Sequence, residues 1–230
     1  MNAKGTKATV LPMIYRPISK DSPLVLASAS PRRKQLLRQI GVPFRTLSSL
    51  VREGTLSRDP LVNARLLAEA KAHAVIEQCG DNWILGADTI VVLDSAVLGK
   101  PGDEDEAFSM LQKLSGKEHR VITGFCLVAP ESKKAHSEAV VTNVAFKALT
   151  RREILGYVAT GEPFGKAGSY AIQGIGAFLV KGITGSYTNV VGLPLCALVN
   201  ALLSTGALKA FPMPCKSSPG WQKNSHVRIP

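Results

Sequence analysis

The first part of the chain alternates short apolar runs with longer stretches in which apolar residues recur at helical spacing. The runs predict strands over about 24–27 and 44–50, and the periodic stretches predict helices over about 31–40 and 60–78. A further apolar run over 83–93 predicts another strand, which continues past a polar residue in its middle. Strands and helices in this order are typical of an α/β fold.

The second part of the chain adds a long hairpin to this pattern. Two stretches over about 119–129 and 136–146 predict neighbouring strands joined by a short loop. Capping residues predict helices that begin after Asp103 and Thr150, and a last helix is expected over 194–203. Because βα units and a hairpin occur together, we predict a single α/β domain with a mixed β-sheet flanked by helices.

Charge is concentrated at the two ends of the chain. The 230 residues carry a net charge of +11, of which +3 lies in 1–22 and +4 in 207–230. We predict that these ends are flexible extensions of a domain over 23–206. The domain keeps only +4, which argues against a nucleic-acid-binding face and leaves polyanion binding by the extensions as an alternative.

Signals for export and for structural metals are missing from the sequence. No apolar stretch reaches the roughly 18–20 residues needed to cross a bilayer, and the first residues contain no apolar core of a secretory signal. The cysteines show neither a CxxC pair nor metal-site spacing: Cys79, Cys126, Cys196 and Cys215. We therefore expect a cytoplasmic protein without a membrane contact.

The turn from the first strand into the first helix has the sequence S-A-S-P-R-R over 28–33. Ser30 is suited to cap the helix, and Pro31 to its first position, where a backbone N–H would have no helical partner. The remaining N–H groups, the positive end of the helix dipole and the side chains of Arg32 and Arg33 then converge on one point, which suits a phosphate group. The alternative is an ordinary capped helix with solvated arginines.

A carboxylate and a lysine interrupt apolar patterns elsewhere. Asp88 lies inside the run over 83–93, where a carboxylate is costly unless it is paired, hydrogen-bonded or bound to metal. It is a candidate general base or Mg²⁺ ligand, with a capped turn between two strands as the alternative. Lys71 falls on the apolar stripe of the helix over 60–78. Its ammonium either extends to solvent or faces a pocket with a carboxylate or phosphate.

The segment over 161–174 contains too many glycines for a regular helix or strand. Its beginning is one residue short of a P-loop, and Ala167 stands where that motif needs Ser or Thr. We expect a loop whose backbone approaches a ligand closely, with Tyr170 and Gln173 able to contact a planar group. A folded surface loop without a ligand is the alternative.

Taken together, these segments resemble the Maf family of nucleoside triphosphate pyrophosphatases. The matching pieces, in family order, are S-A-S-P-R-R (28–33), Glu53, A-K-A (70–72), G-A-D-T-I-V (86–91), G-K-P (99–101), L-S-G-K-E-H-R-V-I-T-G (114–124), G-E-P-F-G-K-A-G-S-Y-A-I-Q-G (161–174) and G-S-Y-T-N-V-V-G-L-P (185–194). They cover nearly the whole body, which favours the functional alternatives above. One departure is Gly165, where many relatives carry an acidic residue.

The resemblance implies a Maf/ITPase-like fold and the hydrolysis of a nucleoside triphosphate to the monophosphate and pyrophosphate with a divalent cation, Mg²⁺ or Mn²⁺. It implies that Asp88 accepts a proton from the water that attacks the α-phosphorus, and that Glu53 joins Asp88 in the metal or water network. The residues implied to hold the triphosphate are Ser28, Arg33, Lys71 and Lys100. Those that match positions linked to base selection are Arg32, Thr89 and Gln173.

The form Y-A-I-Q-G over 170–174 resembles the branch of the family that acts on dTTP and UTP. The resemblance also implies a homodimer.

Displacement at phosphorus needs positioned cations and metal rather than a covalent nucleophile, and this sequence offers cations and carboxylates without an evident nucleophile. A second hypothesis is a non-catalytic nucleotide-binding regulator of cell division, against which the complete set of acidic and basic residues argues. A third is nucleic-acid binding through the basic ends.

Overall fold

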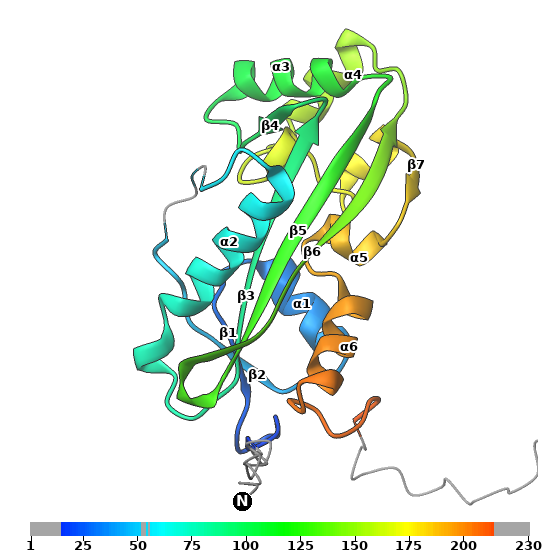
Figure 1. Ribbon diagram of the computed structural model, residues 1–230. Helices are drawn as coiled ribbons and strands as arrows, with labels where there is room; N and C mark the ends of the chain where they lie inside the picture. The colour runs from blue at the N-terminus through cyan, green and yellow to red at the C-terminus, as the bar shows by residue number, and fades with distance from the viewer. Residues whose placement is uncertain (1–14, 52–53, 55, 214–230) are drawn as a thin grey trace, which may run out of the picture.

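The computed structural model describes residues 15–51, 54 and 56–213. They form a seven-stranded mixed sheet in the order β2-β1-β3-β5-β6-β7, with β4 paired to β3 (Figure 1). Strand β1 is parallel to β2 and β3, and the other pairs are antiparallel. The strands are β1 Leu24–Leu26, β2 Phe44–Thr46, β3 Ile84–Leu93, β4 Ala96–Leu98, β5 Glu118–Ala129, β6 Lys133–Phe146 and β7 Val180–Thr184. The predicted class, an α/β domain with a mixed sheet, is confirmed.

Helices cover both faces of this sheet. In Figure 1, α2 lies along one face, α1 and α6 lie against the other, and α3 and α4 pack together at one end. The helices are α1 Pro31–Gln39, α2 Pro60–His73, α3 Glu104–Leu114, α4 Arg151–Val158, α5 Tyr187–Val191 and α6 Leu195–Ser204. Short 3₁₀ segments are Ile76–Gln78, Pro130–Ser132, Ala167–Ser169 and Ile175–Leu179. In the described part of the chain, no helix is long and apolar enough to cross a membrane.

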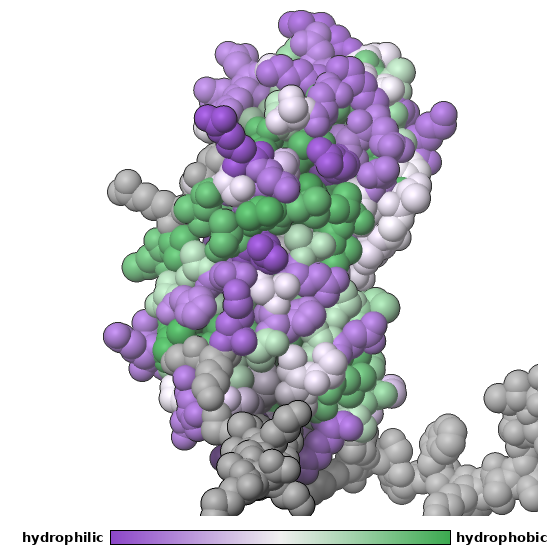
Figure 2. Space-filling model, viewed as in Figure 1, coloured by the Kyte–Doolittle hydropathy of each residue, from purple (hydrophilic) through white to green (hydrophobic). Residues whose placement is uncertain are grey.

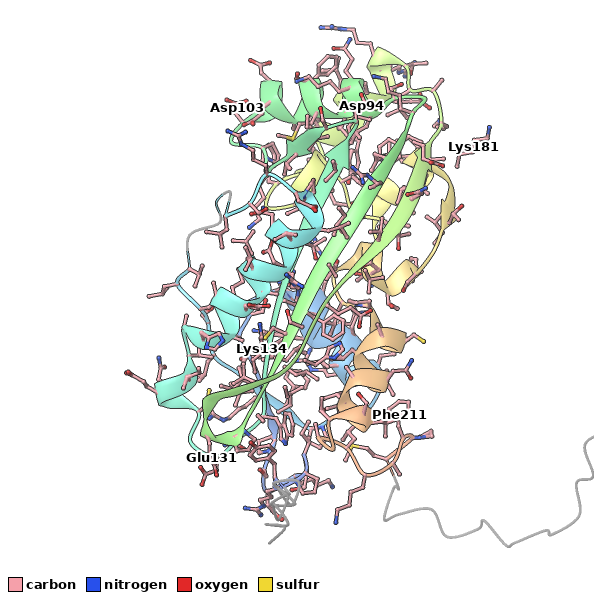
Figure 3. All side chains as sticks on the ribbon, viewed as in Figure 1. Asp94, Asp103, Glu131, Lys134, Lys181 and Phe211 are labelled. Carbon is pink, nitrogen blue, oxygen red and sulfur yellow. The ribbon has the colours of Figure 1, made fainter. Side chains whose placement is uncertain are left out.

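Strand β3 and the β5–β6 hairpin run along the length of the molecule. Glu131, at the turn between β5 and β6, lies at one end, and Asp94, at the turn after β3, lies near the other (Figure 3). Strand β3 therefore connects the end that contains α1 and α6 with the end that contains α3 and α4. A site along its middle can draw residues from both ends.

The core is divided by the alternation of side chains along β3. Leu85 and Ala87 pack in one cluster with Leu36 of α1 and Leu198 of α6. Ile84 belongs to the cluster under α2. Because β3 is buried on both faces, nearly all of its side chains are apolar, which explains the continuous apolar run in the sequence.

Two glycines let α2 lie close to the sheet. A Cβ atom at Gly86 would lie 2.1 Å from the carbonyl oxygen of Ala68, and one at Gly124 would lie 2.2 Å from that of Ala64. Both obstacles are backbone atoms of α2, so no change of side-chain rotamer could relieve them. The absence of side chains at these positions allows Lys71, three residues after Ala68, to reach β3.

Several element boundaries differ from those predicted. Strand β2 ends at Thr46, and α2 ends at His73 because Val75 leaves the helical conformation, with φ −115° and ψ 3°. Strands β4 and β7 and helix α5 were not predicted. They are three to five residues long, too short for a hydrophobic period to be recognised.

The described parts of the two predicted extensions pack on the domain. Ile18 is buried and its N–H donates to the carbonyl of Ala207 at 2.8 Å. The indole N–H of Trp83 donates to the carbonyl of Arg16 at 3.1 Å. Packed structure therefore begins before residue 23 and continues past residue 206, while 1–14 and 214–230 lie outside the described residues.

Candidate active site

A pocket of about 680 Å³ opens where the pairing of β3 is interrupted. Strand β1 pairs with Ile84 and Leu85, and β4 pairs with Val91–Leu93. Within the described residues, no strand pairs with the stretch of this edge between them, so the middle of β3 borders the pocket. Its lining includes every predicted site residue that the structure describes: Ser28, Arg32, Arg33, Lys71, Asp88, Thr89, Lys100 and Gln173.

Asp88 and Lys71 form a buried ion pair on the pocket wall. Lys71 Nζ donates to Asp88 Oδ1 at 2.5 Å, and the two residues are only 7% and 4% exposed. Strand β3 passes through Asp88 without a turn, so the capped-turn alternative is wrong. Among the described residues, Asp88 Oδ2 has no hydrogen-bond partner. One carboxylate oxygen is therefore oriented by Lys71, and the other has acceptor positions for both a cation and a proton.

The guanidinium of Arg33 is buried beneath the first turn of α1, which Ser30 caps as predicted. Its Nε donates to the carbonyl of Gly192 at 2.8 Å, and its Nη1 to Ser28 Oγ at 3.1 Å. Its Nη2 donates to Thr89 Oγ1 at 3.1 Å. Three acceptors from three separate segments thus hold one cation beside a helix N-terminus, an arrangement suited to a phosphate.

The hydroxyl of Thr89 forms hydrogen bonds with both Arg33 and Thr123. Thr123 Oγ1 donates to the carbonyl of Asn189 at 2.9 Å, so its only hydrogen is used there. In the 2.9 Å contact between the two threonine hydroxyls, Thr89 is therefore the donor. Thr89 accepts from Arg33 and donates to Thr123, which leaves it without a hydrogen for a ligand.

A second part of the wall carries the cations Arg32 and Lys166. Burial lowers the pKa of Arg32. Burial, followed by the charge of Arg32, lowers the pKa of Lys166, while Glu162 acts in the opposite direction. The ammonium of Lys166 donates to the carbonyls of Glu162 and Phe164. This part of the pocket is rich in donors and suits a ligand edge that carries acceptors.

Lys100 and Gln173 are the most exposed predicted residues of the pocket. Lys100 follows β4, and its neighbour Gly99 accepts from the N–H of Gly168 at 2.9 Å, which joins this segment to the glycine-rich loop. Glu53, predicted as the partner of Asp88, lies outside the described residues.

The pocket offers the carboxylate of Asp88 as a ligand for a divalent cation. The described residues contain no group of three His, Cys, Asp or Glu side chains that could hold a metal ion. Mg²⁺ is commonly held by one or two carboxylates together with substrate phosphates and water. Asp88, with one open carboxylate oxygen, meets that requirement, and Glu53 is the predicted second ligand.

Known proteins are similar to this chain over most of its length. A family model described as Maf-like protein matches residues 23–205. The chain belongs to the Maf family. The dTTP/UTP pyrophosphatase of Citrifermentans bemidjiense is 51% identical over 190 residues, which are 82% of this Maf chain and 98% of the relative. The dTTP/UTP pyrophosphatase of Syntrophotalea carbinolica is 48% identical over 198 residues, 85% and 90% of the two chains.

Solved structures give a more distant similarity. A nucleoside-triphosphatase / dITP/XTP pyrophosphatase from Mycobacterium abscessus overlaps this Maf chain with a TM-score of 0.38 and 14% sequence identity. The overlap covers 54% of this chain and 74% of the other.

The Maf pocket also depends on residues that the sequence analysis did not single out. Thr123 and Asn189 support Thr89, and Tyr157 and Glu162 hold the glycine-rich loop. Each is a single polar residue in a strand, helix or loop, without a spacing pattern that would mark it. Thr123, Glu162 and Asn189 lie in segments that match the family motifs, whereas Tyr157 lies outside those segments.

Proposed function

We propose that this Maf protein hydrolyses dTTP and UTP to the nucleoside monophosphate and pyrophosphate. Relatives at about half identity over most of the chain carry that name. The observation that carries the proposal is the placement of Asp88: a buried carboxylate at the interruption of β3, with one oxygen bound by Lys71 and the other open to the pocket. A pocket with several cations around one open carboxylate suits a triphosphate and an attacking water.

Water is the nucleophile in the proposed reaction. Asp88 Oδ2 accepts a proton from the water as the water oxygen forms a bond to the α-phosphorus. The bond between this phosphorus and the oxygen that bridges to the β-phosphate breaks, and pyrophosphate leaves with the bonding electrons. Lys71 orients the carboxylate for the proton transfer.

The triphosphate lies against the cationic part of the pocket in this proposal. Arg33, fixed by its three acceptors, Ser28 and Lys100 hold the phosphates, and the N-terminus of α1 adds its partial positive charge. A divalent cation held by Asp88, Glu53 and the phosphates would neutralise part of the triphosphate charge.

Base selection is proposed for Arg32 and Gln173. Uracil and thymine present a carbonyl at C4 and an N–H at N3, so an amide that both donates and accepts matches that edge. Arg32 supplies further donors for carbonyl oxygens. Thr89, whose hydrogen is used by Thr123, influences selection through its bond to Arg33 rather than by donating to the base.

The test is pyrophosphate release from a panel of nucleoside triphosphates with Mg²⁺ or Mn²⁺. The wild type is expected to favour dTTP and UTP, and Asp88→Asn to lose at least about a hundredfold in kcat, the usual contribution of a general base. The matched control is Asp103→Asn. Asp103 caps α3 by accepting from the N–H of Glu106 at 2.8 Å, and asparagine is an equally good cap.

Two results would change the conclusion. Full turnover by Asp88→Asn would remove Asp88 from the role of base. A folded wild type that releases pyrophosphate from no triphosphate would favour the alternative of a non-catalytic nucleotide-binding regulator of cell division.

We propose that the protein is a homodimer. Figure 2 shows a band of apolar surface across the face that carries α2 and the hairpin. The exposed side chains of Leu61, Val97 and Val141 surround a small buried cluster on this side of the sheet. Contiguous exposed apolar surface is typical of protein–protein contacts.

We also propose a cytoplasmic location. The described cysteines, Cys79, Cys126 and Cys196, are free thiols. Burial and the charge of Glu69 raise the pKa of Cys126 to about 12, although Lys134 lowers it. Free thiols fit a reducing compartment.

A further inference from the structure

Glu162 is the centre of a hydrogen-bond cluster beside the pocket. Its Oε1 accepts from the hydroxyl of Tyr157 at 2.8 Å and from the N–H of Gly176 at 2.9 Å. Its Oε2 accepts from the N–H of Ile175 at 2.9 Å. One carboxylate therefore receives three donors, two of them from the start of the 3₁₀ segment Ile175–Leu179, which directly follows the glycine-rich loop.

These bonds hold the loop on both sides of Gln173. The N–H of Ala171 donates to the hydroxyl of Tyr157 at 3.1 Å, so the segment before Gln173 is held by the same cluster as the segment after it. Tyr157 is 2% exposed and packs in the core under α3 and α4. The loop is thereby anchored to the body of the domain through α4.

The loop is packed against Glu162 without spare space. A Cβ atom at Gly174 would lie 2.1 Å from Glu162 Oε2, and one at Gly176 would lie 2.5 Å from the hydroxyl of Tyr157. A side chain at Gly174 would displace the Glu162 carboxylate, and one at Gly176 would also lie 2.7 Å from the backbone carbonyl oxygen of Ala171. A change in the position of the Glu162 side chain therefore moves the backbone that carries Gln173.

The charge of Glu162 suits this role. Burial acts to raise its pKa, but the bonds from Gly176, Tyr157 and Ile175 and the charge of Lys166 together lower it. A carboxylate accepts several hydrogen bonds and donates none, whereas an amide of the same shape would place its NH₂ group against one of these donors.

We propose that Glu162 is a positioning residue that sets the base selectivity of the pocket by fixing Gln173. The proposal rests on the proposed function, because selectivity is defined only for an active pyrophosphatase. Glu162 supports the preference for uracil and thymine over cytosine. Uracil and thymine have a C4 carbonyl and an N3–H, whereas cytosine presents an amino group and an acceptor at those positions. It does not act on the phosphates.

The test compares kcat/KM for dTTP and dCTP in the full chain. In Glu162→Gln, the ratio of the two values is expected to fall about tenfold, the usual effect of one broken buried hydrogen bond. Tyr157→Phe, which keeps the ring and removes only the hydroxyl, is expected to shift the ratio in the same direction. This second variant keeps the proposal testable if Glu162→Gln fails to fold.

The matched control is Glu153→Gln on α4, the helix that carries Tyr157. Glu153 accepts from Thr150 in the capping box of α4 and binds Lys147, but it does not line the pocket. The Glu153→Gln variant is expected to have a lower melting temperature and an unchanged ratio of kcat/KM for dTTP to kcat/KM for dCTP. A purely structural role of Glu162 would give the same result as this control.

A double variant shows whether Glu162 acts through Gln173. In a Gln173→Ala background, Glu162→Gln is expected to change the ratio no further, because the side chain it positions is already gone. An additive effect, or an equal loss for both substrates in Glu162→Gln, would overturn the proposal while the proposed function stands. A wild type that releases no pyrophosphate from dTTP or UTP would overturn both.

Discussion

His119 lies behind the pocket wall, with its ring in edge contact with those of Phe146 and Tyr170, which also contact each other. Its Nε2 is 2.8 Å from the hydroxyl of Tyr170, which lines the pocket, and its Nδ1 has no partner among the described residues. Burial lowers the pKa of His119 to about 4 and raises that of Tyr170. At the scale of the residue, burial keeps this pair neutral, whereas Asp88 is accommodated by a cationic partner, Lys71.

The neutral state of His119 predicts a loss of stability in acid. The pKa in the folded state is about 4 and the ordinary value is 6.5, so the unfolded chain binds the proton more tightly. The stability that the neutral His119 contributes is constant at pH values well above its ordinary pKa of 6.5. This contribution falls as the pH drops towards the pKa of about 4 in the folded state. Between pH 7.5 and 5 the loss is expected to be about 2 kcal/mol.

Urea unfolding at these two pH values checks this prediction. His119→Gln cannot titrate, and its loss between pH 7.5 and 5 should be smaller than that of the wild type by the same amount. An identical loss in both proteins would show that other groups cause the acid sensitivity.

At the scale of the element, the distance between α2 and the sheet decides whether the site forms. Ala64, Ala68 and Lys71 lie along the same side of α2, and the two alanines pack on strands whose facing residues are glycines. Any side chain on Gly86 or Gly124 would push the helix outward. Lys71 would then lose its 2.5 Å contact with Asp88.

Gly124→Ala tests this close approach. Its Cβ would lie 2.2 Å from the carbonyl oxygen of Ala64 and 2.6 Å from the N of Arg65, both backbone atoms. We expect a destabilisation of about 3 kcal/mol from overpacking, together with a fall in kcat, since the helix that carries Lys71 must move.

Thermal unfolding and pyrophosphate release measure the two effects. The matched control is Gly156→Ala in α4, where a Cβ would meet nothing within 4 Å. Alanine favours the helix there, so stability should be unchanged or slightly raised and activity retained. Equal behaviour of the two variants would mean that the α2 contact is not tight in solution.

At the scale of the whole molecule, unequal strand lengths create the pocket. Strand β1 has three residues and its neighbour β3 has ten, so the sheet is incomplete beyond the end of β1. The N-terminus of α1, the segment after β4 and the glycine-rich loop all border this gap. On the α2 side of the molecule, apolar side chains are exposed where a second chain is proposed to pack (Figure 2).

Light scattering after size exclusion tests the homodimer. The wild type should have twice the mass of the 24.5 kDa chain, and Val141→Lys on the apolar band should shift it to a single chain. The control is Leu155→Lys, an exposed apolar position on α4, which should keep the doubled mass. A wild type with the mass of one chain would contradict the proposal.

The elements that could be predicted are those with a strong local signal. The run that became β3, the capping residues of α3 and α4, and the Ser-Pro start of α1 were identified from sequence because caps and periodicity act over a few neighbouring residues. Strands β4 and β7 are short segments that form only by pairing with β3 and β6. Strand β4 forms a hairpin with the end of β3 that directly precedes it, whereas the existence of β7 depends on a partner that is distant in the sequence.

The sequence by itself determined which residues are out of place among apolar neighbours: Asp88 in an apolar strand, Lys71 on an apolar helix face, and two arginines at a capped helix start. It could do so because the cost of burying a charge depends mainly on the apolar character of its neighbours. Only the tertiary structure decided that Lys71 meets Asp88, that Thr123 turns Thr89 towards Arg33, and that Glu162 holds the loop of Gln173. Other contacts of the site join segments still farther apart, such as Arg33 and Gly192, which are separated by 159 residues. Their geometry follows from strand order, strand length and the space left by glycines, which no local pattern records.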